Sequence, residues 1–113
     1  MNFFIRLLIS ALVAFGLSSL LPGVHIDSFV TALILALVLA VLNMLLKPIM
    51  VILTLPITII TFGLFLLVIN AAIILLASKL VDGFKVDGFW WALLFSILLS
   101  VVTSILHSGD KNK

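Results

Sequence analysis

The chain has 113 residues, of which 65% are hydrophobic and 9% charged, and its net charge is +2 at neutral pH. A mean hydropathy of +1.57 lies far outside the range of soluble domains, and so small a net charge gives no reason to expect a nucleic acid partner. The absence of cysteine excludes a disulfide framework, a thiolate metal site and a cysteine nucleophile. The composition predicts a single integral membrane domain over residues 1–113, with the lipid bilayer as its main partner.

Residues 3–21 form the first apolar run, which is long enough for one membrane span and ends at the turn-forming pair Pro22 and Gly23. A charged start followed by an apolar stretch is also typical of a cleaved signal peptide. However, a second apolar run over residues 29–46 follows the turn, where a secreted protein would continue with a polar domain. Residues 1–47 are therefore predicted to form a helical hairpin in the membrane.

The next apolar stretch, residues 48–78, is too long for one untilted crossing, because a straight helix of that length would measure about 46 Å. Proline and glycine weaken helices, so breaks are predicted at Pro48, Pro56 and Gly63. We expect residues 48–61 to form a linker that lies at the interface or re-enters the bilayer. Hydroxyl groups in this linker can bond backbone groups left unpaired near a proline; they belong to Thr54, Thr58 and Thr61.

Two further apolar runs complete the predicted set of four spans. Residues 62–78 are the third span and residues 89–106 are the fourth, joined by a polar loop. Together they form a second hairpin over residues 62–107. A polar tail over residues 108–113 ends the chain.

The second hairpin repeats part of the first. Residues 82–107 align without gaps on residues 22–47, and eight of these 26 positions are identical, including the turn residues Gly23 and Gly83. A duplication explains such matches better than a shared leucine content does. The predicted fold is an all-α polytopic membrane protein, with four transmembrane helices arranged as two parallel-repeat hairpins.

Lysine and arginine indicate the orientation, because they are retained preferentially on the cytoplasmic side of a membrane. Four spans place both termini on the same side. With the termini inside, four basic residues are cytoplasmic and two are outside: Arg6, Lys47, Lys111 and Lys113 against Lys79 and Lys85. We therefore expect both termini in the cytoplasm, with the protein in a bacterial plasma (inner) membrane.

Small residues recur at every fourth position on three predicted spans, which keeps them on one helix face. They are Ser10, Ala14 and Ser18 on the first span, Ala32, Ala36 and Ala40 on the second, and Ala92, Ser96, Ser100 and Ser104 on the fourth. Such residues let helix backbones approach closely in lipid, so these faces either pack one bundle or join protomers into a homo-oligomer. A pseudo-two-fold axis along the membrane normal would pair the second stripe with the fourth.

Polar side chains within the spans are few, and they are the usual place to look for function in a membrane protein. Asn43 and Lys47 share one face of the second span, and Asn70 lies near the middle of the third. Asn70 can cross-link helices, join protomers or line a polar path, and all three interpretations remain open. Lys47 is expected to extend toward lipid phosphates as an interface anchor.

Four residues stand at the outer ends of the second and fourth spans. Asp27 and Asp87 precede the two spans and are predicted to cap them; the alternative is a cation held between the repeats, which requires the two carboxylates to converge. Trp90 and Trp91 fit the aromatic belt at a membrane interface. Stacking on a substrate is the alternative for the tryptophans.

The residues offer little for catalysis. The chain has no Glu, Tyr or Cys, and the predicted topology places His25 and His107 on opposite sides of the membrane. Motifs for zinc, for phosphate loops and for serine nucleophiles are absent. We therefore predict no enzyme, no metal and no cofactor. Coupled transport ordinarily needs ionisable groups at mid-membrane, whereas a passive pore needs fewer special residues.

Several segments resemble those of the phage holin family 4, superfamily IV, of four-span bacterial membrane proteins. They are the LNxxLKP stretch at 42–48, the TLPIT stretch at 54–58, the TFGLF stretch at 61–65 and the GFxVDGFW loop at 83–90. The resemblance covers nearly the whole chain. It implies a holin, a small protein that accumulates in the membrane, associates, and opens lesions that release endolysin or collapse the membrane potential.

Three hypotheses from different functional classes follow. The first is a holin-like protein that self-associates through the small-residue faces and permeabilises the membrane. The second is a non-lytic structural or stress-associated envelope protein with an unidentified protein partner, in which the same faces pack one bundle. The third is a small-solute channel or transporter whose path is lined by Asn43, Asn70 and the threonines near Pro56.

Overall fold

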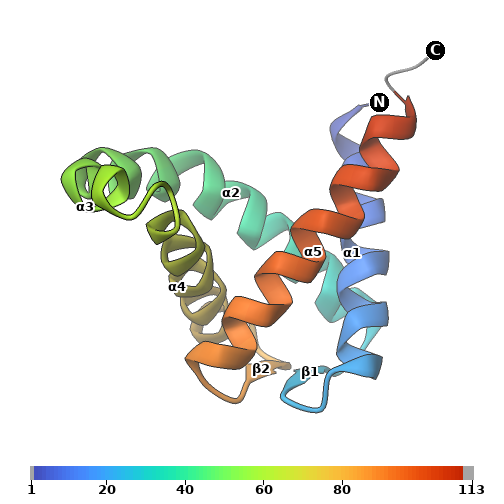
Figure 1. Cartoon of the computed structure of the whole chain (residues 1–113). Helices are drawn as coiled ribbons and strands as arrows, with labels where there is room; N and C mark the ends of the chain where they lie inside the picture. The colour runs from blue at the N-terminus through green and yellow to red at the C-terminus, as the bar shows by residue number, and fades with distance from the viewer. Residues whose placement is uncertain (1, 111–113) are drawn as a thin grey trace.

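The computed structural model describes residues 2–110, without the side chains of residues 107–110. It contains five helices and two short strands (Figure 1). In chain order these are α1 (Phe3–Leu20), β1 (Val24–Ile26), α2 (Phe29–Leu53), α3 (Leu55–Ile60), α4 (Phe65–Leu80), β2 (Phe84–Val86) and α5 (Phe89–Asp110). Helix α5 thus continues into the predicted polar tail 108–113, of which residues 111–113 lie outside the described part.

The all-α prediction is wrong in one respect, because the two loops that join the hairpin helices pair as antiparallel strands. Val24 lies opposite Val86, His25 opposite Lys85, and Ile26 opposite Phe84. Val24, Ile26 and Phe84 are buried while His25 is exposed, which is the alternation of a strand with one covered face. A three-residue strand carries too weak a local signal to be predicted, and its partner lies about sixty positions away.

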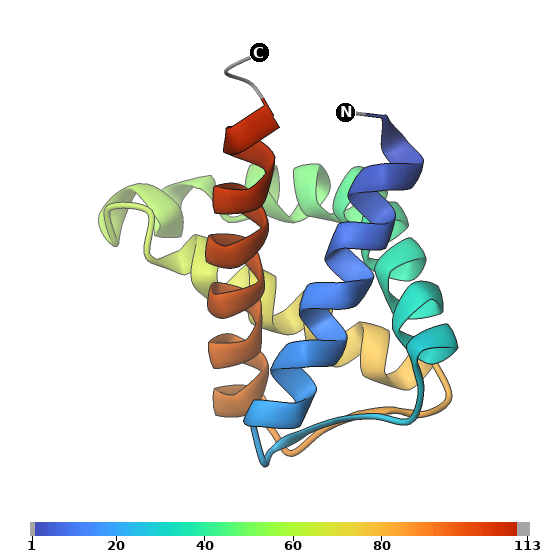
Figure 2. The same cartoon turned by 90° about the vertical axis from the view of Figure 1, so that its right-hand side faces the viewer.

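Helices α1, α2, α4 and α5 form a bundle in which each one packs against two of the other three. Helix α1 lies along α2 and α4 lies along α5, while α2 also contacts α4 and α1 contacts α5. Within the described residues, α2 and α5 stand diagonally and make no close backbone approach (Figures 1 and 2). The large buried side chains gather in the half of the bundle near the strands; they include Leu35, Ile73, Phe84 and Phe95.

Helix α2 does not end at Pro48 as predicted, but continues through it to Leu53. Figure 2 shows that α2 changes direction on the way, so that its last turns run nearly level across the bundle. Proline removes one backbone donor and crowds the preceding turn. In an apolar environment, ending the helix would leave more backbone groups unpaired than the proline itself removes, so the helix bends and persists.

The predicted breaks at Pro56 and Gly63 coincide with interruptions of the helical path. The short helix α3 starts one residue after Thr54 and carries Pro56 in its first turn, where a missing amide hydrogen breaks no helical bond. The chain then reverses at Phe62 and Gly63, which have positive φ angles of 56° and 87°. Helix α4 begins after this reversal, at Phe65, three residues later than the predicted third span.

Three of the described helices, α1, α2 and α5, are long and apolar enough to cross a membrane. Helix α4 is a shorter apolar helix of 16 residues, which corresponds to about 24 Å, against a hydrocarbon thickness of about 30 Å. No residue of α3 is buried, and Phe62 beside it is 96% exposed. The elbow formed by α3 and the adjoining turn is therefore an apolar projection from the bundle.

Candidate functional site

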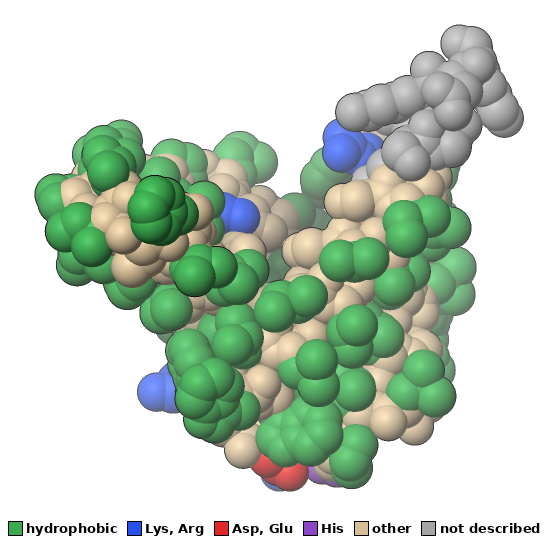
Figure 3. Space-filling view, viewed as in Figure 1, with side chains coloured by type: hydrophobic (Ala, Val, Ile, Leu, Met, Phe, Trp, Pro, Cys, Tyr) green, Lys and Arg blue, Asp and Glu red, His purple; other side chains and the backbone are tan. Residues whose placement is uncertain are grey.

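A cleft of about 420 Å³ lies between α1, α2 and α5, on the side of the bundle away from the strands. Figure 3 shows the surface hollowed between α2 and α5, with basic side chains on both sides of the hollow. Its volume is in the range of small-ligand pockets. Polar and apolar residues share the lining: Arg6, Ser10, Asn43, Ser100 and Thr103 with Phe3, Leu7, Ala14, Ala36, Leu39, Ala40 and Leu99.

A second cavity of about 70 Å³ adjoins this cleft and extends between α2, α4 and α5. The two cavities share Leu39, Asn43, Leu99 and Ser100, so they are neighbours, and we call them together the recess. The second cavity adds three polar side chains, those of Lys47, Asn70 and Ser96. The structure thus brings Asn43, Lys47 and Asn70 to one place from two different helices.

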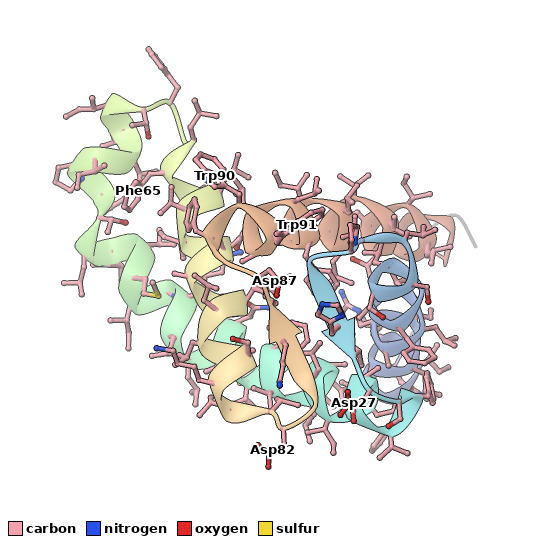
Figure 4. All side chains as sticks on the ribbon, turned by 90° about the horizontal axis from the view of Figure 1, so that it is seen from below. Asp27, Phe65, Asp82, Asp87, Trp90 and Trp91 are labelled. Atoms are coloured by element: carbon pink, nitrogen blue, oxygen red, sulfur yellow. The ribbon has the colours of Figure 1, made fainter. Side chains whose placement is uncertain are left out.

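The charge of this recess is positive. Arg6 and Lys47 are in its lining, which contains no aspartate. The described aspartate side chains belong to Asp27, Asp82 and Asp87, all near the strands at the opposite end of the bundle (Figure 4). Within the described residues, neither Arg6 nor Lys47 forms a salt bridge, so both cations are available to an anion.

The amides of the recess are also available. Neither Asn43 nor Asn70 forms a side-chain hydrogen bond with any described residue, whereas two hydroxyls of the lining are occupied. Ser96 Oγ donates to Leu93 O at 2.9 Å, and Thr103 Oγ1 donates to Leu99 O at 2.7 Å. An unpaired amide is costly in an apolar medium, so water or a polar ligand is the natural partner for Asn43 and Asn70.

The small-residue stripes are mostly turned inward. Ala14, Ala32, Ala36, Ala92 and Ser96 are buried within the chain, and Ser10, Ala40 and Ser100 line the recess. Ser104 is exposed, and Ser18 is half-buried with its hydroxyl donating to Phe15 O at 2.7 Å. The stripes of α2 and α5 do not pair across an axis, because these helices stand diagonally with the recess between them.

The threonines of the linker lie outside the recess and do not line a path there. Thr54 Oγ1 donates to Met50 O at 2.8 Å and lies 3.5 Å from Thr58 Oγ1. Thr61 Oγ1 donates to Ile57 O at 3.0 Å and accepts from the Phe65 amide at 3.1 Å. These bonds pair backbone groups on both sides of the elbow and hold its shape.

Asp27 and Asp87 do not act as side-chain caps in the described structure. Ser28 caps α2 instead, its Oγ accepting from the Thr31 amide at 3.2 Å. The aspartates contribute their backbone amides: Asp27 N–H donates to Gly83 O at 3.0 Å, and Asp87 N–H donates to Gly23 O at 2.8 Å. These two bonds extend the strand pairing by one residue at each end.

The same register keeps the two carboxylates apart, which argues against a cation held between them. Because Asp87 lies opposite Gly23, the aspartates are four residues apart along the paired strands, or about 13 Å. Figure 4 shows Asp27 and Asp87 at different ends of the paired strands β1 and β2. Asp87 Oδ2 lies 3.9 Å from His25 Nε2, and both side chains are more than half exposed.

The two tryptophans differ in their surroundings (Figure 4). Trp90 is 76% exposed, as a side chain at a lipid interface would be. Trp91 is half-buried and packs flat against Gly23, where any side chain would overlap its ring. It therefore holds the turn after α1. Lys47, the third predicted anchor, is half-buried and lines the recess.

The sequence analysis did not single out two polar residues of the lining as site residues, Arg6 and Thr103. Arg6 was used only to orient the chain, although an ionisable residue inside an apolar run is itself a functional signal. Thr103 follows Ser100 by three positions, which places both on one face of α5. Neither signal reveals which helices stand across the recess.

Comparison with known proteins identifies the family. Residues 1–105 match the family described as mycobacterial 4 TMS phage holin, superfamily IV. The chain belongs to this holin family. The membership confirms the resemblance found in the sequence, and the family description specifies four transmembrane segments, whereas three helices here reach full span length and α4 is shorter.

Two relatives of this holin-family chain are both described as uncharacterized. The uncharacterized membrane protein YvlD of Bacillus subtilis is 38% identical over 106 residues, covering 93% of this chain and 89% of its own. The uncharacterized protein SCO3922 of Streptomyces coelicolor is 43% identical over 86 residues, covering 73% of this chain and 69% of its own. No solved structure matches. The chain is thus a membrane protein of a holin family.

Proposed function

We propose that this protein is a small permeation protein, whose recess admits water and polar solutes into the membrane from the side of the termini. The observation that carries the proposal is the polar recess reaching Asn70 inside an otherwise apolar bundle. A protein that only fills or stiffens a membrane gains nothing from an unpaired amide at that depth, since such a group is costly to keep in an apolar medium.

The position of the recess suggests from which side solutes enter. Arg6 and Lys47 lie at the end of the bundle that carries both termini, away from the strands. The distribution of lysine and arginine favours that end as cytoplasmic. In the proposed orientation the recess opens to the cytoplasm, and the paired strands face the outside of a bacterial plasma membrane.

At the opposite end the bundle is sealed by large buried side chains, including Leu35, Phe84 and Phe95. A single protomer in this conformation is therefore a half-channel. Conduction requires either a rearrangement of the two hairpins or an assembly of several protomers.

A duplicated architecture would provide such a rearrangement, and the strand register supports it. The repeat relates each residue of the first hairpin to the residue sixty positions later. Under this shift Val24 corresponds to Phe84 and Ile26 to Val86, so exchanging the repeats turns the strand pair Val24 and Val86 into the pair Ile26 and Phe84. We place the pseudo-two-fold axis between His25 and Lys85, with α1 related to α4 and α2 to α5.

Single cysteines test the hydration of the recess directly, because the natural chain has none. Asn43→Cys, Asn70→Cys and Ser100→Cys place a thiol in the recess, whereas Val41→Cys and Ile34→Cys place one on exposed apolar positions of α2. Membrane-impermeant thiol reagents should label the recess cysteines in inverted vesicles and leave the two α2 controls unlabelled, because a thiol in lipid ionises little.

Recess cysteines that stay as unreactive as the α2 controls would refute a hydrated path. Labelling from the outer side alone would reverse the proposed orientation. Release of a small dye from liposomes containing purified protein then measures permeation itself. Ser100→Leu, which narrows the recess, should reduce that release severalfold at equal protein content.

Holin-like self-association is the second candidate, and it is favoured by the family and by the outward position of Ser104 with the apolar elbow around Phe62. Its signature is a release rate that rises steeply with protein density, whereas permeation through single protomers rises in proportion to it. No release at any density would leave a non-lytic envelope role, which the inward-facing small residues fit equally well.

A further inference from the structure

We propose that the recess is a binding site for the phosphate of an anionic membrane lipid, with Arg6 and Lys47 as its principal contacts. This inference uses the same cavity as the proposed permeation path, but binding can be measured without any flux. It names a ligand class for a site that the membership of the family does not explain.

The lining of the recess carries positive charge without a counter-ion. Arg6 lines the larger cavity, Lys47 lines the smaller one, and Asn43 belongs to both. The lining contains no carboxylate, and neither cation forms a salt bridge with a described residue. An anion that enters the recess is therefore attracted by both cations.

The donors of the recess suit a phosphate group. A guanidinium presents two parallel N–H groups that match two phosphate oxygens, and an ammonium adds a compact charge. The unpaired amides of Asn43 and Asn70 can donate further hydrogen bonds. Arginine, lysine and amide donors on converging helices together suit a tetrahedral oxyanion better than a cation or a neutral sugar.

The position and lining of the recess indicate the source of the anion. The recess opens between α2 and α5, which make no close approach to each other (Figure 3). Apolar side chains share its lining, among them Phe3, Leu39 and Leu99. An anionic lipid matches both the polar and the apolar part of this lining. Its phosphate can reach the cations while its acyl chains remain beside the apolar side chains. Basic pockets between helices on the cytoplasmic side are known to hold anionic headgroups.

Native mass spectrometry of the purified full chain, titrated with phosphatidylglycerol, phosphatidylcholine or inorganic phosphate, tests this site. We expect the wild type to bind phosphatidylglycerol in preference to phosphatidylcholine. Each cation should contribute about fivefold in affinity, so the Arg6→Gln, Lys47→Gln double variant should bind about 25-fold more weakly. The matched control is Lys79→Gln, Lys85→Gln, which removes the same charge at exposed positions outside the recess and should bind as the wild type does.

Arg6→Lys keeps the charge but loses the paired N–H groups, so it should weaken binding by less than the fivefold expected for loss of the cation. A folded variant with this intermediate affinity separates loss of a contact from loss of the fold. Equal binding of the two lipids, or undiminished binding by the Arg6→Gln, Lys47→Gln variant, would overturn the proposal. Displacement of phosphatidylglycerol by an equal concentration of inorganic phosphate would overturn the lipid as the source. If cysteine labelling or dye release fails while selective lipid binding persists, the permeation proposal falls and this site stands.

Discussion

Replacing Gly23 with alanine tests how the strand end of the bundle is held together. A Cβ atom at this position would overlap the indole ring of Trp91, which packs directly on the glycine. The backbone cannot move away easily, because Gly23 O accepts a hydrogen bond from the Asp87 amide at 2.8 Å. The ring must therefore retreat by about 1 Å or more to reach ordinary contact distance.

Overpacking of this kind costs about 1 to 3 kcal/mol, and we expect a value near the upper end, about 3 kcal/mol, because both partners are fixed. Gly16 is the matched control: it lies within α1 with nothing near its Cβ position, so Gly16→Ala should stabilise the helix by up to about 1 kcal/mol. The two substitutions add the same methyl group and are expected to change stability in opposite directions.

The assay is unfolding in mixed micelles, followed by tryptophan fluorescence. Trp90 and Trp91 are the two tryptophans of the chain and both lie at the strand end, so the emission of the folded Gly23→Ala variant should also change. If Gly23→Ala proves as mild as Gly16→Ala, then Trp91 does not pack on this turn and the role given to it is wrong.

Two further substitutions test the hydrogen bonds that shape the helices. Thr61→Val keeps the volume but removes the oxygen that accepts from the Phe65 amide at 3.1 Å. Leaving that amide unpaired should cost about 1 to 3 kcal/mol of unfolding free energy, measured by the same unfolding assay. An unchanged unfolding midpoint would contradict the role given to the elbow threonines. Ser28→Ala removes the cap of α2 and should lower the unfolding free energy by about 1 kcal/mol. Asp27→Ala should lower it less, because Asp27 contacts Gly83 through its backbone amide. A larger loss for Asp27→Ala than for Ser28→Ala would identify Asp27 as the cap.

The sequence predicted the elements whose causes are local. Apolar runs of span length gave the starts of α1, α2 and α5, and the positive φ at Gly63 occurs where a weak point in the helix was expected. The helix break predicted at Pro48 is wrong because the effect of a proline depends on the medium. In lipid, a continuous helix pairs more backbone groups than an interrupted one does. The strands were missed because each has only three residues and no local partner.

The recess was predictable only in part. Asn43, Lys47 and Asn70 were singled out as polar groups in apolar runs, and they do meet. Their meeting depends on the packing of α2 against α4, which does not follow from helix periodicity. Arg6 joins them from α1 for the same reason. Periodicity gives the face of each helix, but the partner of that face is decided by packing among all the helices.

The two hairpins are joined at one end by the paired strands and at the other end by the elbow between α2 and α4. Because α1 and α5 have no chain connection at the end away from the strands, we expect one hairpin to move against the other by pivoting about the paired strands, with a displacement that grows with distance from them. The walls of the recess lie farthest from the pivot and separate most for a given rotation, while the aromatic seal beside the strands moves least. A ligand bridging Arg6 and Lys47 would act with the longest lever arm available, and so would govern how far the hairpins open.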